Sequence, residues 1–293
     1  MEDSHFMEWF KTITEWIGII IGIILIYLHY HSIRKGRNPI HNITKSSQTP
    51  LKSILISLGL VFICVILVIL YSYPRVFEIF WTNKSIIGKG ILCTLEVSFL
   101  SVIIGSILGA LVALIITLPK NYAILTILDS ALLSFIYILL GIPALVFLFY
   151  FYYGPTRQFS VFWISVLALS INLAPFVAKI VIASIRNISK EQIDSALSFG
   201  YTPWQRFWYF QVLFVVKNAS QSLLVEYYTT IKLSSLAGIF TLYETYHATL
   251  DIVTNTYDTV NAYAILGICY VLIVTWIAVL ADYLELKWKP IIN

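Results

Sequence analysis

Charged residues are scarce in this chain of 293 residues, in which Asp, Glu, Lys and Arg together make up 12%. Soluble domains carry roughly a quarter of their residues as charges, because these side chains coat the surface that faces water. Hydrophobic residues instead make up 59% of this sequence. Half of the usual charge cannot cover a globule of this size, so a water-soluble protein is excluded and the apolar surplus is expected to face lipid.

Patterns that hold metals, disulfides or catalytic groups are also missing. The three cysteines, Cys64, Cys93 and Cys269, stand in separate apolar runs without a CxxC motif, so we interpret them as packing residues and expect no metal site. No HExxH or GxSxG motif occurs, and the histidines lie at the ends of apolar runs or in loops, which argues against an intramembrane enzyme. The net charge of +4 is too small to indicate a nucleic-acid partner.

Long hydrophobic runs are what the sequence does contain. A helix needs about 20 apolar residues to cross a bilayer, whose interior offers the backbone no water. By that criterion we predict an all-α, polytopic helix bundle of about seven spans. The runs are 13–30, 53–73, 91–118, 122–152, 161–185, 212–242 and 261–284. The fourth and sixth are long enough to tilt, kink or break. In the third, Gly105 and Gly109 form a GxxxG pair, which predicts close helix packing.

The basic residues predict the orientation of the chain in the membrane. The 31–52 loop holds five Lys and Arg residues and no acid, and 186–211 and the C-terminal tail fall on the same side. The 243–260 loop on the other side carries Glu244 and Asp251 and no Lys or Arg. Because cytoplasmic loops are enriched in Lys and Arg, we expect the N-terminus outside and the C-terminus in the cytoplasm. The first residues are acidic, unlike a signal peptide, so 13–30 is expected to remain a membrane helix.

The predicted cytoplasmic segment from Ser189 to Leu213 has the signals of a helix–turn–helix. Ser189 and Gln192 form a capping box, and Gly200 suits the left-handed turn that ends a helix. Thr202 and Gln205 form a second capping box, with Pro203 at the first helical position. Such a hairpin either connects two spans or docks a cytoplasmic partner that covers its short apolar face.

The stretch from Asp194 to Gly200 resembles the EAA loop of ATP-binding-cassette importer permeases, and other segments resemble this family in the same order. These segments are Gly90 with Thr94–Ser98, Gly141–Leu145 with Phe147–Tyr150, Ser170–Asn172 with Ala174, and Glu226–Lys232 with Ser234–Ala237 and Glu244. The set is most similar to the polar amino-acid importers. The chain departs from the pattern at Leu140, where the family has Arg, and at Leu213, where it has Pro.

The resemblance implies a domain organisation and a set of partners. It implies a two-helix extension with a basic loop at 1–85, a permease domain with a five-helix core at 86–285 and a cytoplasmic tail at 286–293, with the coupling loop at 187–213. It further implies a second permease subunit, the same or homologous, a pair of ATP-binding subunits and a periplasmic solute-binding protein, in a bacterial inner membrane. This chain has no P-loop, so ATP hydrolysis is expected on another chain and no cofactor on this one.

The resemblance also implies two sets of functional residues. The coupling loop residues are Asp194, Ser195, Ala196, Gly200, Tyr201 and Pro203, which would contact the ATPase. Candidates for the translocation pathway or the subunit interface are Lys179, Asn172, Glu226, Lys232 and Pro143, because charges within spans need a partner or water. The implied function is import of a small polar solute of the amino-acid class. The alternative is a diverged membrane scaffold or regulatory subunit without its own solute flux.

Overall fold

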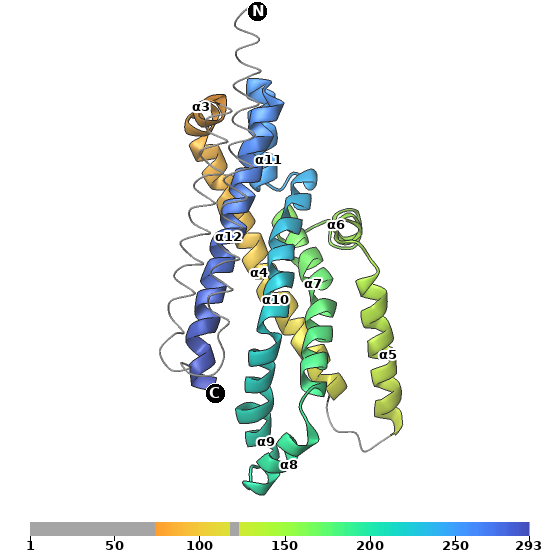
Figure 1. The fold of residues 1–293 in the computed structure, drawn as a ribbon. Coiled ribbons are helices and arrows are strands. Elements are labelled where there is room, and N and C mark those ends of the chain that lie inside the picture. Colours follow the sequence, from red (N-terminus) through yellow and green to blue (C-terminus); the bar gives the residue numbers. More distant parts are fainter. Residues whose placement is uncertain (1–73, 118–122, 293) are drawn as a thin grey trace, which may run out of the picture. The chain divides into compact units, whose positions relative to one another are not determined.

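The computed structural model describes residues 74–117 and 123–292, and the regular elements in those ranges are helices (Figure 1). They are α3 (Pro74–Thr82), α4 (Lys84–Thr117), α5 (Ala123–Leu140), α6 (Ala144–Tyr153), α7 (Val161–Arg186), α8 (Lys190–Ser198), α9 (Pro203–Arg206), the π-helix η1 (Phe207–Val212), α10 (Leu213–Leu233), the 3₁₀-helix η2 (Ser234–Phe240), α11 (Thr245–Thr256) and α12 (Thr259–Ile292). The predicted runs 13–30 and 53–73 lie outside the described residues.

The chain divides into two compact units. Among the described residues, the first unit contains α3 and residues 260–268 at the start of α12. Within α3, the rings of Phe77 and Trp81 stack with their centroids 6.2 Å apart. The second unit contains 83–117, 123–259 and 269–292, and it holds all the segments that the sequence singles out as functional.

Helices α4 and α7 form the central pair of the second unit. A Cβ on Gly105 would lie 2.9 Å from the carbonyl oxygen of Ser170, and a Cβ on Gly109 would lie 2.5 Å from that of Ala174. Only glycine permits such an approach, so the packing role predicted for the GxxxG pair is confirmed. The Ser170 hydroxyl also donates to the Ser101 carbonyl across the same contact, at 3.4 Å.

Two apolar clusters pack around this pair. The first joins α4, α6, α7 and η2 through Val97, Phe147, Leu148, Val166, Ala168, Leu169, Ala237, Phe240 and Leu242. The second joins α4, α5 and α7 through Ala113, Ile116, Ile136, Ala178 and Ile182. Helix α7 belongs to both clusters, which explains why it is the most buried of the candidate spans.

Three described helices are long and apolar enough to cross a membrane, namely Lys84–Thr117, Val161–Arg186 and Thr259–Val279. The predicted run 122–152 is instead a bent pair, α5 and α6, whose axes differ by 94°. Pro143 stands at the N-cap of α6 in an extended conformation and disfavours a helical conformation at the residue before it. The prediction that the fourth run could break is therefore confirmed. The total number of spans stays a prediction.

The predicted run 212–242 also departs from one continuous α-helix. It begins within η1, continues as α10 and ends as η2, so the α-helical hydrogen bonding changes at both ends. The segment 243–260, expected between spans, also holds a helix, α11. With 12 residues α11 is too short to cross the membrane, so the expectation that 243–260 connects two spans stays a prediction.

Candidate functional site

The first half of the helix–turn–helix folds as its sequence predicts. The amide of Gln192 donates to the Ser189 hydroxyl at 3.3 Å, and the amide of Ser189 donates to the Gln192 side chain at 3.1 Å. This reciprocal capping box starts α8. Hydrogen bonds from its own backbone amide and from Ser189 hold the pKa of the Glu191 carboxyl below its usual range. A negative charge in the first helical turn is itself favourable.

The turn after α8 is closed by glycine. Gly200 has a φ of +75°, and its amide donates to the Leu197 carbonyl at 2.9 Å, while the Tyr201 amide donates to the Ala196 carbonyl at 3.3 Å. These two bonds form a Schellman motif, which satisfies carbonyls that the helix end would leave unpaired. A Cβ on Gly200 would meet no atom within 4 Å, so the backbone conformation alone requires glycine there.

The second capping box also forms. The Thr202 amide donates to Gln205 at 2.9 Å, and the Gln205 amide donates to the Thr202 hydroxyl at 3.3 Å. Pro203 begins α9, as predicted. The two short helices are thus closed by their own hydrogen bonds at three successive points, which makes the hairpin a compact element at one end of α7 and α10 (Figure 1).

The predicted coupling residues divide by exposure. Asp194, Ser195, Gly200 and Tyr201 are exposed, whereas Ala196 is buried. Ala196 is therefore the part of α8 that packs against the rest of the chain, and the other four residues lie on the exposed face of the hairpin.

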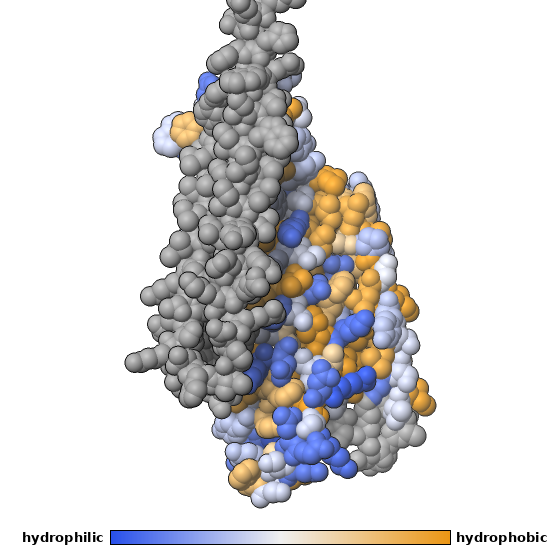
Figure 2. All heavy atoms as spheres, in the orientation of Figure 1, coloured by the Kyte–Doolittle hydropathy of each residue, from blue (hydrophilic) through white to orange (hydrophobic). Residues whose placement is uncertain are grey.

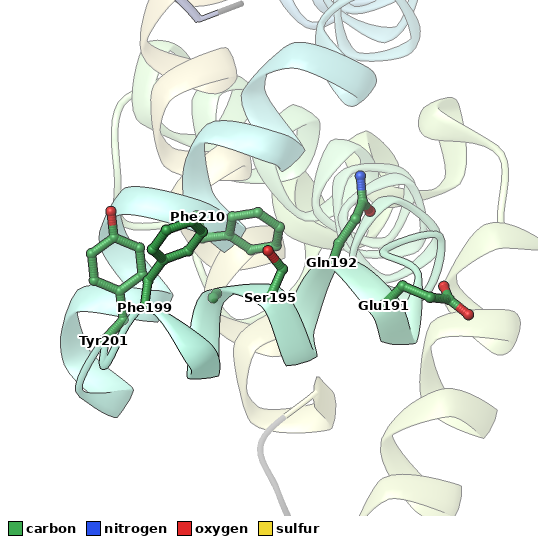
Figure 3. A pocket seen from close by; sticks show the side chains of 7 residues that line it. Glu191, Gln192, Ser195, Phe199, Tyr201 and Phe210 are labelled. Atoms are coloured by element: carbon green, nitrogen blue, oxygen red, sulfur yellow. The ribbon is translucent and has the colours of Figure 1, made fainter.

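A hollow of about 390 Å³ lies between α8 and η1, lined by Glu191, Gln192, Ser195, Ala196, Phe199, Tyr201 and Phe210. Figure 3 shows Ser195 and Phe199 directed to the side of α8 on which Phe210 lies, while Glu191 extends at the far end. Its floor is apolar and its rim carries an acid and an amide, a mixture that suits a protein surface better than lipid tails.

Exposed aromatic rings continue this surface along α9 and η1. Phe199 is 78% exposed, Trp204 70% and Tyr209 67%. The Trp204 ring stacks on Phe207 at 6.2 Å and meets Trp208 edge-on at 5.6 Å. Trp and Tyr are enriched both at membrane–water interfaces and in protein interfaces, so the rings mark the hairpin as a contact surface.

One side of α10 is polar along its length, and this side is named here the polar face of α10. Its members are Asn218, Gln221, Ser222, Glu226, Thr229 and Lys232, which follow one another at helical spacing and are exposed apart from the partly buried Glu226. Val225 is an apolar residue on the same side. Helix α10 is not among the described helices that pass the test for a lipid-crossing span. A helix with such a face needs water or protein beside it.

A hydrogen bond beside the polar face joins α10 to α4. The Ser106 hydroxyl of α4 donates to the Tyr227 hydroxyl of α10 at 2.9 Å. In the orientation of Figure 1, Figure 2 shows hydrophilic residues gathered towards the end that carries α8 and α9, among apolar ones.

The structure separates the other predicted pathway residues. Asn172 lies buried in α7, and the Lys179 ammonium of the same helix sits 5.4 Å from the ring centroid of Tyr137 in α5. No ion pair joins Lys179 and Glu226 in the part of the chain that the structure describes. Pro143 marks the bend before α6. Lys179 and the polar face of α10 are therefore separate features rather than one charged pair.

Among the residues that the structure describes, the most buried acid is Glu244, which the sequence placed within the resemblance but not among the candidate functional residues. Glu244 has no exposed surface and bonds residues that are far away in the sequence, such as Tyr270 and Thr94. In the sequence it stands in a segment of low charge, and the resemblance alone does not distinguish a buried carboxylate from a solvated one.

Comparison with known proteins agrees with this geometry. Residues 105–290 match the family described as binding-protein-dependent transport system inner membrane component. The nopaline transport system permease protein NocM of Agrobacterium fabrum is 28% identical over 193 residues, which cover 61% of this chain and 78% of that protein. The probable amino-acid ABC transporter permease protein YckA of Bacillus subtilis is 28% identical over 203 residues, 68% of this chain and 88% of that one.

Solved structures show the same fold. The crystal structure of an amino acid ABC transporter with histidines matches with a TM-score of 0.62 at 24% identity and covers 70% of this chain and 95% of that one. The MetNI methionine ABC transporter matches with a TM-score of 0.59 at 18% identity, over 68% and 94% of the two chains. With the family match over more than half of its length, the chain belongs to the binding-protein-dependent inner membrane components, the multi-pass permease subunits of ATP-binding-cassette importers.

Proposed function

We propose that this permease subunit carries a small polar solute of the amino-acid class along the polar face of α10, driven by a separate ATPase that docks on the α8–α9 hairpin. Relatives that match 61–73% of this chain are, by name, permease proteins for nopaline, for amino acids, for arginine and for glutamine. No cofactor of its own is needed for this role, because the energy would come from ATP bound to the partner.

The polar face of α10 is the observation that carries the pathway. Asn218 and Thr229 direct hydrogen bonds to the carbonyls of Phe214 and Val225, at 2.9 Å each, so these side chains are partly satisfied by their own helix. The face suits a solute with both charges, since Glu226 and Lys232 supply one charge of each sign. A second permease subunit beside α10 would exclude lipid from this face and enclose the path.

The hairpin supports the docking of an ATPase. Its exposed face contains Asp194, Ser195 and Tyr201 next to the hollow, and its caps make it stiff enough to transmit a displacement. Helix α10 continues from α9 through η1 without a loop, so movement of the hairpin reaches the polar face directly. A periplasmic solute-binding protein would deliver the solute at the opposite end.

Co-purification tests the docking. The chain would be purified from its native membrane in mild detergent, and co-purifying chains would be identified by mass spectrometry. We expect an ATP-binding subunit with wild type, and less of it with Gly200→Val, because a β-branched residue resists the left-handed conformation. Gly200→Asn is the matched control, since Asn adopts that conformation readily. Absence of an ATPase from wild type would instead favour the scaffold reading.

Thiol labelling tests the pathway. In a background without the native cysteines, Ser222→Cys and Thr229→Cys would be treated with a membrane-impermeant thiol reagent in membrane vesicles. We expect both to react, because the polar face is wet. Leu111→Cys is the control, since Leu111 is 52% exposed on the apolar span α4 and should remain unlabelled in lipid. Equal labelling at all three positions would contradict the assignment.

Uptake of radiolabelled glutamine and arginine into proteoliposomes with ATP then tests the solute class.

A further inference from the structure

Glu244 is a buried carboxyl with unusually many donors. Its Oε2 accepts from the Tyr246 amide at 2.8 Å and from the Tyr270 hydroxyl at 3.1 Å, and its Oε1 accepts from the His247 amide at 3.0 Å. The Thr94 hydroxyl reaches Oε2 at 3.5 Å. Each of these partners is an uncharged donor, so among the described residues Glu244 is held by hydrogen bonds.

These bonds join three helices that are distant in the sequence. Thr94 belongs to α4, Tyr270 to α12, and Thr245 begins α11. The hydroxyls of Thr94 and Thr245 lie 2.8 Å apart, and the Thr245 amide donates to the Thr94 hydroxyl at 3.1 Å. Gly90 leaves room for this contact, because a Cβ there would lie 2.9 Å from the Cβ of Ala248. The Glu244 cluster therefore fixes the start of α11 to α4 and α12.

The segment just before Glu244 is strained. Helix η2 continues in the 3₁₀ form for seven residues, longer than such helices usually run. It ends at Thr241, which has a φ of 65° and a ψ of 15°. A β-branched residue rarely adopts this left-handed conformation, so the surrounding contacts must hold it there.

Two sets of contacts hold the strained turn at Thr241, which is called the joint from here on. On one side, Phe240 packs against the rings of Phe149 and Tyr152, each with a centroid distance of 4.9 Å. On the other side, the carboxyl of Glu244 lies directly against Gly238 of η2, where a Cβ would collide with it. Helix α10 leads into η2 without a break, so the position of this joint determines where the outer end of the polar face lies.

We propose that Glu244 is a positioning residue of the transport cycle: its buried carboxyl holds the strained joint at Thr241 against α4 and α12, and so sets the position of the outer end of α10. This inference rests on the proposed function, in which the polar face of α10 forms the pathway. Glu244 does not itself contact the solute. Its loss would let the joint relax from the left-handed conformation and shift α10 relative to α4.

Hydrogen exchange tests the clamp without any solute. The chain, with the ATPase where one co-purifies, would be placed in lipid nanodiscs, and amide exchange over 236–248 would be measured by mass spectrometry. We expect Glu244→Ala to speed exchange about tenfold or more there, because buried donors lose their acceptor. Glu244→Ala with Thr241→Gly should recover protection, since glycine adopts the left-handed conformation without strain. Glu96→Ala, an exposed acid two residues from Thr94, is the control and should change nothing.

ATP turnover per folded complex tests the positioning role. Glu244→Ala should change the maximal rate of Mg-ATP hydrolysis while the KM for ATP stays at the wild-type value, and Thr241→Gly should restore the rate. A purely structural role would reduce only the amount of folded complex. Unchanged exchange over 236–248, or faster exchange with unchanged turnover, would overturn the proposal. If no ATPase co-purifies, the proposed function fails, while the exchange data still decide whether the clamp exists.

Discussion

Gly109 of α4 lies so close to α7 that a Cβ on it would come within 2.5 Å of the carbonyl oxygen of Ala174 and 2.7 Å of the Cβ of Val177. Both neighbours belong to a helix backbone or its first side-chain atom and cannot rotate away. The short distance between α4 and α7 therefore depends on the absence of a methyl group at position 109.

Gly109→Ala should consequently destabilise the chain by about 1–3 kcal/mol, the usual cost of overpacking a tight contact. The matched control is Gly88→Ala in the same helix, because a Cβ on Gly88 meets no atom within 4 Å. Thermal unfolding in one detergent, followed by size-exclusion chromatography, compares the two. Equal midpoints would mean that α4 and α7 can separate without loss.

Removing the N-cap side chain of either capping box should weaken the helix that it starts. Ser189→Ala and Thr202→Ala each remove a side-chain acceptor from a helix start, at a cost of about 0.5–2 kcal/mol to that helix. The hairpin is exposed, so the loss should increase local hydrogen exchange over 189–206 and leave the global unfolding midpoint nearly unchanged. Ser198→Ala serves as the control, since its hydroxyl bonds the Asp194 carbonyl within α8 and caps neither helix start.

The contact between Ser106 and Tyr227 should contribute modestly to stability. Tyr227→Phe removes the acceptor of the Ser106 hydroxyl, and hydrogen bonds between membrane helices average about 0.6 kcal/mol in measured cases. We expect a small drop in the unfolding midpoint in nanodiscs, and no further drop when Ser106→Ala is added. Tyr209→Phe, whose ring is 67% exposed, is the control. Additive losses from the two substitutions would show that the hydroxyls do not act as a pair.

Stability should also depend on pH through Glu244, which lies between η2 and α11 and outside the candidate spans. Burial raises the pKa of this carboxyl above its ordinary value of 4.5, against the opposing effect of the backbone and hydroxyl donors. The folded chain then binds the proton more tightly than the unfolded chain. This contribution is fully present below the ordinary value and is lost as the pH rises through the raised pKa.

The unfolding midpoint of wild type in nanodiscs should therefore fall from acid towards neutral pH, and Glu244→Gln should remove that slope. The other titratable groups around the carboxyl are Cys93 on α4, His247 on α11 and Tyr270 on α12. Glu244→Gln is expected to lower the midpoint at acid pH, because its amide group would face the Tyr246 amide. An identical slope in wild type and variant would assign the pH dependence to another group.

The hairpin could be predicted from the sequence because its signals are local. Ser189 with Gln192, Gly200, and Thr202 with Gln205 act over three residues or within one, and each forms the bond that its spacing predicts. The apolar runs were equally readable, since composition over about 20 residues determines a span. The orientation of the termini and the number of spans remain predictions.

What could not be predicted depends on contacts across the chain. The direction of α6 after Pro143 depends on its packing against α7, although the proline itself was visible. Helix α11 has no run of apolar residues, and its start is fixed by Thr94, 151 residues before Thr245. Lys179 of α7 meets Tyr137 of α5 because these two helices, distant in the sequence, pack together. None of these contacts leaves a periodic pattern in one segment.

The π-helix η1 has a geometric consequence for the hairpin. An α-helix turns by about 100° per residue, and a π-turn accommodates roughly one residue more than an α-turn. The face of α10 that carries Glu226 is thus offset around the helix axis from where an uninterrupted α-helix starting at Pro203 would place it. The six residues of η1 act as an angular spacer between the hairpin and α10. Deleting one of them so that α-helical turns are restored would keep the helix continuous and the hairpin at nearly its present angle.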